Sequence, residues 1–138
     1  MVIKIVLSLT PKTNHMFDIK EITKKCRDMY PMESYRLLKM YGYKFMSWGG
    51  SNFTHVGRTE APLDINKPTK IGKALKFRVK GHHHKGWVYM TCNGSDLYDV
   101  YLVSHEGELV KKLDDLYFDQ VFEEMDKAIE HIPVYGEN

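Results

Sequence analysis

The chain has 138 residues, of which 43% are hydrophobic and 28% are charged, and its formal net charge is +2. This composition is typical of an ordinary soluble globular protein, and no apolar run reaches the roughly 18 residues that a membrane-spanning helix needs. We therefore expect residues 1–138 to form a single domain in the cytoplasm, with no membrane partner.

The first third of the chain predicts one strand and two helices. Residues 2–9, VIKIVLSL, are rich in β-branched residues, and Lys4 interrupts them without a preceding basic segment, so they indicate a strand rather than a signal peptide. A helix is expected from Ile19 to Pro31, and a second one from Pro31 to a cap at Gly42. In the first helix, the apolar residues recur at helical spacing, and they are Ile19, Ile22, Cys26 and Met29.

Short strands are expected after Gly42. Residues 43–48 and 52–56 have β-like composition and flank the Gly49-Gly50 break, which favours a tight turn from strand to strand. Residues 57–73 contain two prolines and two glycines and show little periodicity. This segment therefore predicts a long loop.

The second half of the chain contains the clearest strand signals. Residues 74–79 alternate between apolar and basic side chains, and residues 87–92 form an apolar run that ends at Asn93-Gly94, a strong hairpin signal. The chain then returns through 97–104 and turns into 108–113. We expect consecutive antiparallel strands here.

An amphipathic helix is predicted at residues 117–131. Asp114 and Asp115 precede it, where acidic side chains favour the positive end of a helix. Its apolar stripe consists of Phe118, Val121, Phe122, Met125, Ile129 and Ile132. The predicted fold class is α+β, an antiparallel β-meander packed against a C-terminal helix, with an N-terminal strand and two helices.

The charge is distributed very unevenly. Residues 65–95 carry seven Lys and Arg and no acid, whereas residues 96–138 carry three against twelve Asp and Glu. Alternation in 74–80 places the basic side chains on one sheet face, where they could contact phosphates of a nucleic acid. The alternative is the ordinary solvent face of a half-buried sheet. The candidate nucleic-acid-binding residues are Lys76, Arg78, Lys80, His82, His84 and Lys85.

The histidine triplet, His82 to His84, lies between Gly81 and Gly86 and is expected at a hairpin tip. A structural metal site needs four converging ligands, adjacent residues seldom all point inward, and Lys80 and Lys85 repel a cation. A solvated turn is the favoured interpretation, with no metal and no cofactor.

No motif in the chain indicates catalysis. The stretch SWGGSNF, residues 47–53, lacks the spacing of a phosphate-binding loop, and no nucleophile is placed beside a base. Cys26 and Cys92 favour reduced thiols over a disulfide. The acidic face of the C-terminal helix is either solvated or available to a basic partner or a second copy of the chain. We expect a binding protein rather than an enzyme.

Part of the chain resembles a known group of proteins. The segments YKFMSWGGSNF, LKFRV, SDLYDVYLV and LYFDQVFEEM, within about residues 37–125, are similar to a pattern in small proteins encoded by bacteriophages and other mobile elements. The group has no assigned activity, so the resemblance implies no site residue. It implies an accessory protein in the cytoplasm of a host cell.

Two functions remain open from the sequence. The first is nucleic-acid binding through the basic hairpin, residues 65–89, and the alternative is inhibition or modulation of a host protein. Convergence of the basic side chains on one exposed face would favour nucleic acid, and scattering would favour a protein partner.

Overall fold

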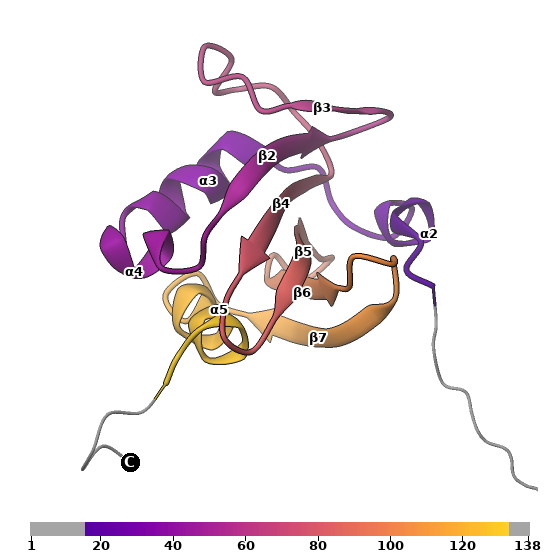
Figure 1. The fold of residues 1–138 in the computed structure, drawn as a ribbon. Coiled ribbons are helices and arrows are strands. Elements are labelled where there is room, and N and C mark those ends of the chain that lie inside the picture. The colour runs from indigo at the N-terminus through magenta and orange to yellow at the C-terminus, as the bar shows by residue number, and fades with distance from the viewer. Residues whose placement is uncertain (1–15, 133–138) are drawn as a thin grey trace, which may run out of the picture.

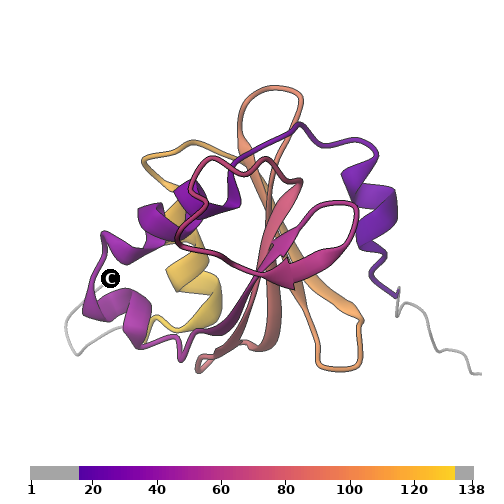
Figure 2. The ribbon, with the colours of Figure 1, turned by 90° about the horizontal axis from the view of Figure 1, so that it is seen from above.

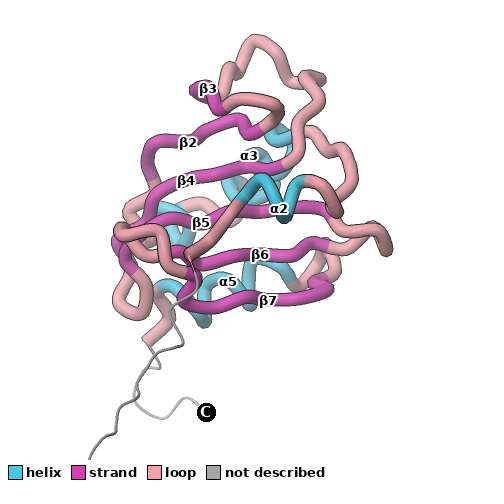
Figure 3. Tube along the Cα trace, turned by 90° about the vertical axis from the view of Figure 1, so that its right-hand side faces the viewer, coloured by secondary structure: helices cyan, strands magenta, loops and turns pink. Residues whose placement is uncertain are grey.

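The structure is a computed structural model that describes residues 16–132. Its centre is a six-stranded antiparallel sheet in the order β3-β2-β4-β5-β6-β7 (Figure 3). The strands are β2 (Ser51–Val56), β3 (Glu60–Pro62), β4 (Ala74–Lys80), β5 (Lys85–Cys92), β6 (Tyr98–Val103) and β7 (Leu109–Leu116). The α+β fold class is confirmed, while the strand expected at residues 2–9 lies outside the described residues.

The meander from β4 to β7 follows the alternation and turn chemistry of the sequence. Leu75, Phe77 and Val79 of β4 are fully buried, which confirms the predicted inner face of this strand. The β5–β6 turn closes through the amide N–H of Asn93, which donates to the carbonyl of Leu97 at 2.8 Å. The side-chain oxygen of Asn93 also accepts a hydrogen bond from the N–H of Ser95 at 2.8 Å, as expected for an Asn-Gly turn.

Helices lie on both faces of the sheet (Figures 1 and 2). One face is covered by α3 (Pro31–Lys39), α4 (Tyr43–Met46) and α5 (Val121–Ile129), and the main core lies beneath them. Its largest fully buried side chains include those of Trp48, Phe77, Leu38, Leu75, Met90 and Met125. None of the helices within residues 16–132 is long and apolar enough to cross a membrane.

The opposite sheet face, which we call the outer face, is only partly covered. The short helix α2 (Ile19–Thr23) lies over it, and the preceding Phe17 ring packs on the rings of Tyr89 and Tyr101 at centroid distances of 4.7 and 5.2 Å. Trp87, near the start of β5, also packs against this cluster, and Figure 3 shows α2 in front of the sheet at β4 and β5.

The prediction of a helix from Ile19 to Pro31 is wrong beyond Thr23, where α2 ends. Asp18 caps its start by accepting a hydrogen bond from the N–H of Lys20 at 3.0 Å. Farther along, the amide of Arg27 donates to the carbonyl of Cys92, and that of Met29 donates to the carbonyl of Gly72. The backbone therefore bonds to the sheet region instead of continuing the helix.

Residues 43–46 are helical, so the strand predicted at 43–48 is also wrong. Phe45 and Trp48 are both buried, and their spacing of three residues matches a helical turn rather than a strand. Gly42 precedes this turn with a φ of 58°, where its lack of a Cβ avoids strain. The second predicted helix, α3, is confirmed, with Pro31 in its first turn.

Three smaller corrections concern the loop and the chain before α5. The 57–73 segment contains β3, so it is not loop throughout. Asp114 and Asp115 belong to β7 rather than to a helix cap, because α5 begins only at Val121. Val121, Phe122, Met125 and Ile129 are buried as predicted. Phe118 precedes the helix and is 63% exposed, so its predicted packing on the sheet is wrong, and Ile132, the last residue of the predicted stripe, lies beyond the helix and is 53% exposed.

Candidate nucleic-acid interface

The register between β4 and β5 brings the predicted basic residues of β4 beside those of β5. Arg78 lies directly opposite Trp87, and Lys80 lies directly opposite Lys85. Directly opposed residues of an antiparallel pair share one sheet face, which here is the outer face, because Leu75, Phe77 and Val79 occupy the other. The predicted alternation of cations on β4 is thus confirmed.

Lys76 does not present a free charge on this face. Its Nζ lies 2.9 Å from the Oε1 of Glu60 on β3, and it also lies 4.5 Å from the ring centroid of Trp87. The side chain is only 16% exposed. Partial burial alone would lower the pKa of Lys76, but the contacts with Glu60 and Tyr89 raise it on balance. Lys76 therefore remains a cation, and Glu60 already neutralises it.

Arg78, Lys80 and Lys85 form what we call the cationic cluster. Among the described residues, no ion pair includes any of them. Arg78 lies over the Trp87 ring at 5.9 Å, and its buried Nε has no hydrogen-bond acceptor in the described part of the chain. Like charges directly opposite each other destabilise a strand pair, so Lys80 and Lys85 impose a cost that no ion pair with an acid in residues 16–132 offsets.

The histidine triplet lies at the tip of the β4–β5 hairpin, as predicted, and His82 and His83 are exposed, but the turn is not simply solvated, because it is bonded to α5. The amides of His83 and His84 both donate to the carbonyl of Ile129, the last residue of α5, at 2.8 and 3.3 Å. The His82 side chain adds a contact of 2.7 Å between its Nδ1 and the Oε2 of Glu130. The hairpin tip therefore caps the C-terminal end of α5, whose carbonyls need such donors.

The individual histidines differ in their access to a ligand. His82 is exposed but paired with Glu130, and the His83 imidazole donates through Nε2 to the carbonyl of His131. His84 is buried, and its Nε2 donates to the carbonyl of Trp87 at 3.1 Å. Burial lowers the pKa of His84 below its ordinary value of 6.5. Of the predicted site residues, His84 is therefore turned away from any nucleic acid.

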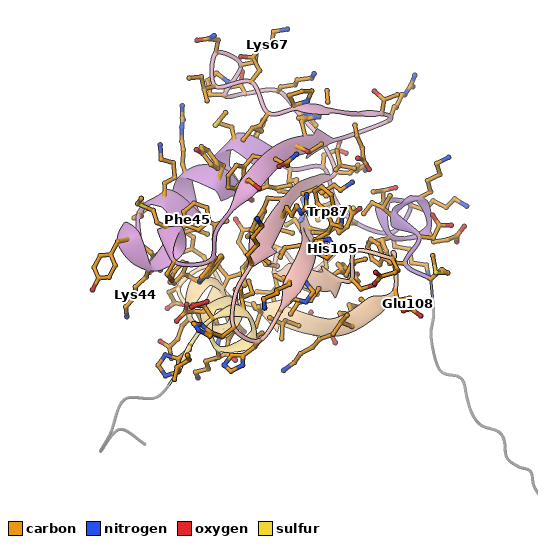
Figure 4. The ribbon with its side chains drawn as sticks, in the orientation of Figure 1. Lys44, Phe45, Lys67, Trp87, His105 and Glu108 are labelled. Carbon is orange, nitrogen blue, oxygen red and sulfur yellow. The ribbon has the colours of Figure 1, made fainter. Side chains whose placement is uncertain are left out.

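The remaining cations of the acid-free segment lie elsewhere. Lys67 is in the loop beyond β3, at the far end of the molecule from α5, whereas Trp87 lies near the middle (Figure 4). Lys73 pairs with the Oδ1 of Asp28 at 2.7 Å. The predicted basic surface of residues 65–89 is thus divided, and the cationic cluster is the part that converges.

Other chemistry-bearing side chains form structural contacts. The thiols of Cys26 and Cys92 are free, and burial raises the pKa of each, which disfavours the reactive thiolate. The buried Asp99 accepts hydrogen bonds from the amide side chain of Asn93 at 3.0 Å and from the N–H of Asp115 at 2.9 Å. Within residues 16–132, no three His, Cys, Asp or Glu side chains group as a metal site requires.

Two features of the site are not predicted from the sequence, namely the pairing of Glu60 with Lys76 and the position of Trp87 beside Arg78. Glu60 lies sixteen residues before Lys76, and only the β2–β3 hairpin returns it to that lysine. The role of Trp87 could have been found, because pairing residues 74–80 with 85–92 in a hairpin already places Trp87 beside Arg78. Comparison of the chain with models of known families, with curated proteins and with solved structures found no match.

Proposed function

We propose that this chain is a non-enzymatic accessory protein of a bacteriophage or mobile element, and that it binds the phosphate backbone of nucleic acid in the host cytoplasm. The observation that carries the nucleic-acid proposal is the opposition of Lys80 and Lys85 beside Arg78, with no ion pair to an acid among the described residues. The repulsion between the two lysines weakens the hairpin in the free protein. Bound phosphates of a polyanion would neutralise both charges and so remove that repulsion.

The composition of the cluster supports backbone contacts rather than base readout. Lysine and arginine neutralise phosphates irrespective of sequence, and specific readout would need side chains aimed at base edges. The Trp87 ring lies next to both Lys76 and Arg78, so its faces are engaged by cations rather than open to a base. We therefore expect weak sequence preference.

The test is fluorescence anisotropy with labelled duplex and single-stranded oligonucleotides at several salt concentrations. If each cation of the cluster neutralises one phosphate, the log–log slope of affinity against salt should be about −3 on duplex and about −2 on single strands. Changing Arg78, Lys80 and Lys85 together to Gln should remove nearly all of this dependence.

Two controls separate the cluster from the general charge of the segment. Replacing both Lys67 and Lys70 by Gln removes two exposed lysines of the same acid-free segment and should leave the slope unchanged. The double variant Lys76→Gln with Glu60→Gln should also leave it unchanged, because the pair carries no net charge before or after the change. Absence of binding at low-micromolar protein in about 50 mM salt would reject the proposal and favour the modulator of a host protein.

A further inference from the structure

An apolar groove lies on the helical side of the sheet, away from the cationic cluster. It has a volume of about 450 Å³ between α3, α4 and the start of β2. The rings of Tyr35, Phe45 and Phe53 line it, and they pack against one another at centroid distances of 4.8 and 5.9 Å. Gly49 and Gly50 complete its wall without side chains. The groove is thus a preformed aromatic recess.

The rim of the groove is unusually apolar for a surface. Met46 of α4 lines the groove and is 74% exposed, and Met40 and Tyr43, on the same α3–α4 segment of the chain, are 76% and 81% exposed. Exposed apolar side chains gathered in one place mark interaction sites, and Tyr and Met are enriched at protein interfaces. The extent of this rim indicates a macromolecular partner rather than a small molecule.

The charge around the groove selects the kind of partner. Lys39 is the charged residue among the described residues that line it, and none of those lining residues is an acid. Lys44 of α4 is a second exposed cation on the helix that contributes Phe45 to the groove (Figure 4). The complementary ligand is an aromatic side chain next to a carboxylate.

The chain itself displays such a segment. Tyr117 and Phe118 are 61% and 63% exposed in the turn before α5, and the exposed Asp119 follows them. In the described part of the chain, no ion pair includes Asp119. The turn is held by Gln120, whose Oε1 accepts a hydrogen bond from the N–H of Tyr117 at 2.8 Å. This bond, together with that from the N–H of Gln120 to the carbonyl of Tyr117 at 3.0 Å, orders the backbone of the turn that displays the aromatic pair.

The groove and this segment lie on the same side of the molecule. The ring of Tyr41, from the α3–α4 turn, stacks on that of Phe122 in the first turn of α5 at 3.8 Å. Phe122 in turn stacks on Trp48, just after α4, at 4.8 Å. Figure 1 shows α4 and α5 next to each other. Two complementary features on one side allow a twofold dimer in which each chain contributes both.

We propose that the chain forms a symmetric homodimer in which Phe118 of each copy enters the aromatic groove of the other and Asp119 approaches Lys39. Each contact buries a Phe118 ring that is largely exposed in the monomer, and it pairs Lys39 with Asp119, which has no ion pair among the described residues. The interface is independent of the cationic cluster on the outer face.

Sedimentation velocity and light scattering over about 1–500 μM protein test this proposal, and they should show a concentration-dependent monomer–dimer equilibrium. Phe118→Ser and Lys39→Glu should each weaken the dimer at least about tenfold. Ile65→Ser and Lys67→Glu are matched controls, because both residues are exposed in the 57–73 loop, away from the groove, and neither should alter the equilibrium.

Mixing the variants gives a sharper test. The Phe118→Ser chain keeps an intact groove, and the Lys39→Glu chain keeps Phe118, so their mixture should form a heterodimer more readily than either variant dimerises alone. Combining Lys39→Glu with Asp119→Lys in one chain should restore part of the affinity. Thermal unfolding of each variant at monomeric concentration checks that it is folded.

Three results would overturn the proposal. The first is a monomer at every concentration, and the second is a dimer that tolerates both Phe118→Ser and Lys39→Glu. The third is a monomer whose groove binds a synthetic acidic peptide with an aromatic anchor, which would assign the groove to another protein.

Discussion

Gly81 lies so close to Ile129, the last residue of α5, that a Cβ at position 81 would overlap the Ile129 carbonyl and its Cγ2 methyl. This contact joins the tip of the β4–β5 hairpin to the C-terminal end of the helix. The sequence places a glycine there because only the absence of a side chain lets the two backbones approach and form the bonds from His83 and His84.

Gly81→Ala should therefore destabilise the protein by roughly 1–3 kcal/mol, the usual cost of adding a methyl group where no space exists. Urea denaturation measures the change. Gly94→Ala is the control, because a Cβ at that hairpin turn meets nothing within 4 Å, and it should change stability by less than about 0.5 kcal/mol. Equal costs at both positions would contradict the close contact.

Phe122→Ala should cost about 3–5 kcal/mol, because the ring is buried between those of Tyr41 and Trp48. Phe118→Ala, four residues earlier and largely exposed, should cost less than about 0.5 kcal/mol. Both are measured by chemical denaturation at low protein concentration, where association does not contribute. A large loss for Phe118→Ala in the monomer would show that its ring packs inward.

Lys85→Glu should improve stability while abolishing nucleic-acid binding. The change converts a repulsive pair with Lys80 into an attractive one, which is worth about 0.5 kcal/mol or somewhat more. The same change places a negative charge where a phosphate would lie. Denaturation and anisotropy on one protein sample measure both effects, and a variant that loses stability without losing binding would argue against the cationic cluster.

His84 should make stability depend on pH below neutrality. Burial lowers its pKa in the folded protein, whereas in the unfolded chain it binds a proton near pH 6.5. The unfolded state then carries more protons, so the stabilisation is fully present above about pH 6.5 and is lost as the pH falls toward the folded pKa.

The variant His84→Gln tests this dependence. Its free energy of unfolding between about pH 7 and pH 5 should fall less steeply than that of the unaltered protein, by at most about 1.4 kcal/mol per pH unit for one proton. An NMR titration of the His84 imidazole gives the folded pKa directly. A value above 6.5 would reverse the predicted sign.

Local patterns were enough to predict the centre of the fold. The alternation of Leu75, Phe77 and Val79 with basic residues fixes which face of β4 is buried, and Asn93-Gly94 fixes the following turn. Both signals act between residues close in sequence. The same kind of signal misled at 43–48, because Phe45 and Trp48 fit a helical turn as well as a short apolar strand, and periodicity over so few residues does not distinguish them.

The site was less predictable because its decisive contacts join distant segments. The alternation of β4 predicts that Lys76 contacts phosphates, but Glu60 reaches Lys76 only after β2 and β3 form. The sequence around the histidine triplet predicts a solvated turn, because the partners of the triplet, Ile129 and Glu130, lie more than forty residues later. A sequence shows which faces are charged, but it does not show which of those charges another element neutralises.

The bond between the hairpin tip and α5 also couples two regions in their motions. An isolated helix of nine residues is too short to be stable in water, so α5 depends on its packing and on the donors from the tip. Local unfolding of the hairpin tip should therefore accompany local unfolding of α5. The amide protons of His83 and His84 should then exchange with solvent at the same rate as the amide protons in the last turn of α5. A bulky fusion that strains the chain beyond Ile132 would then loosen the strand ends that carry Lys80 and Lys85, although neither lysine is near the C-terminus in sequence.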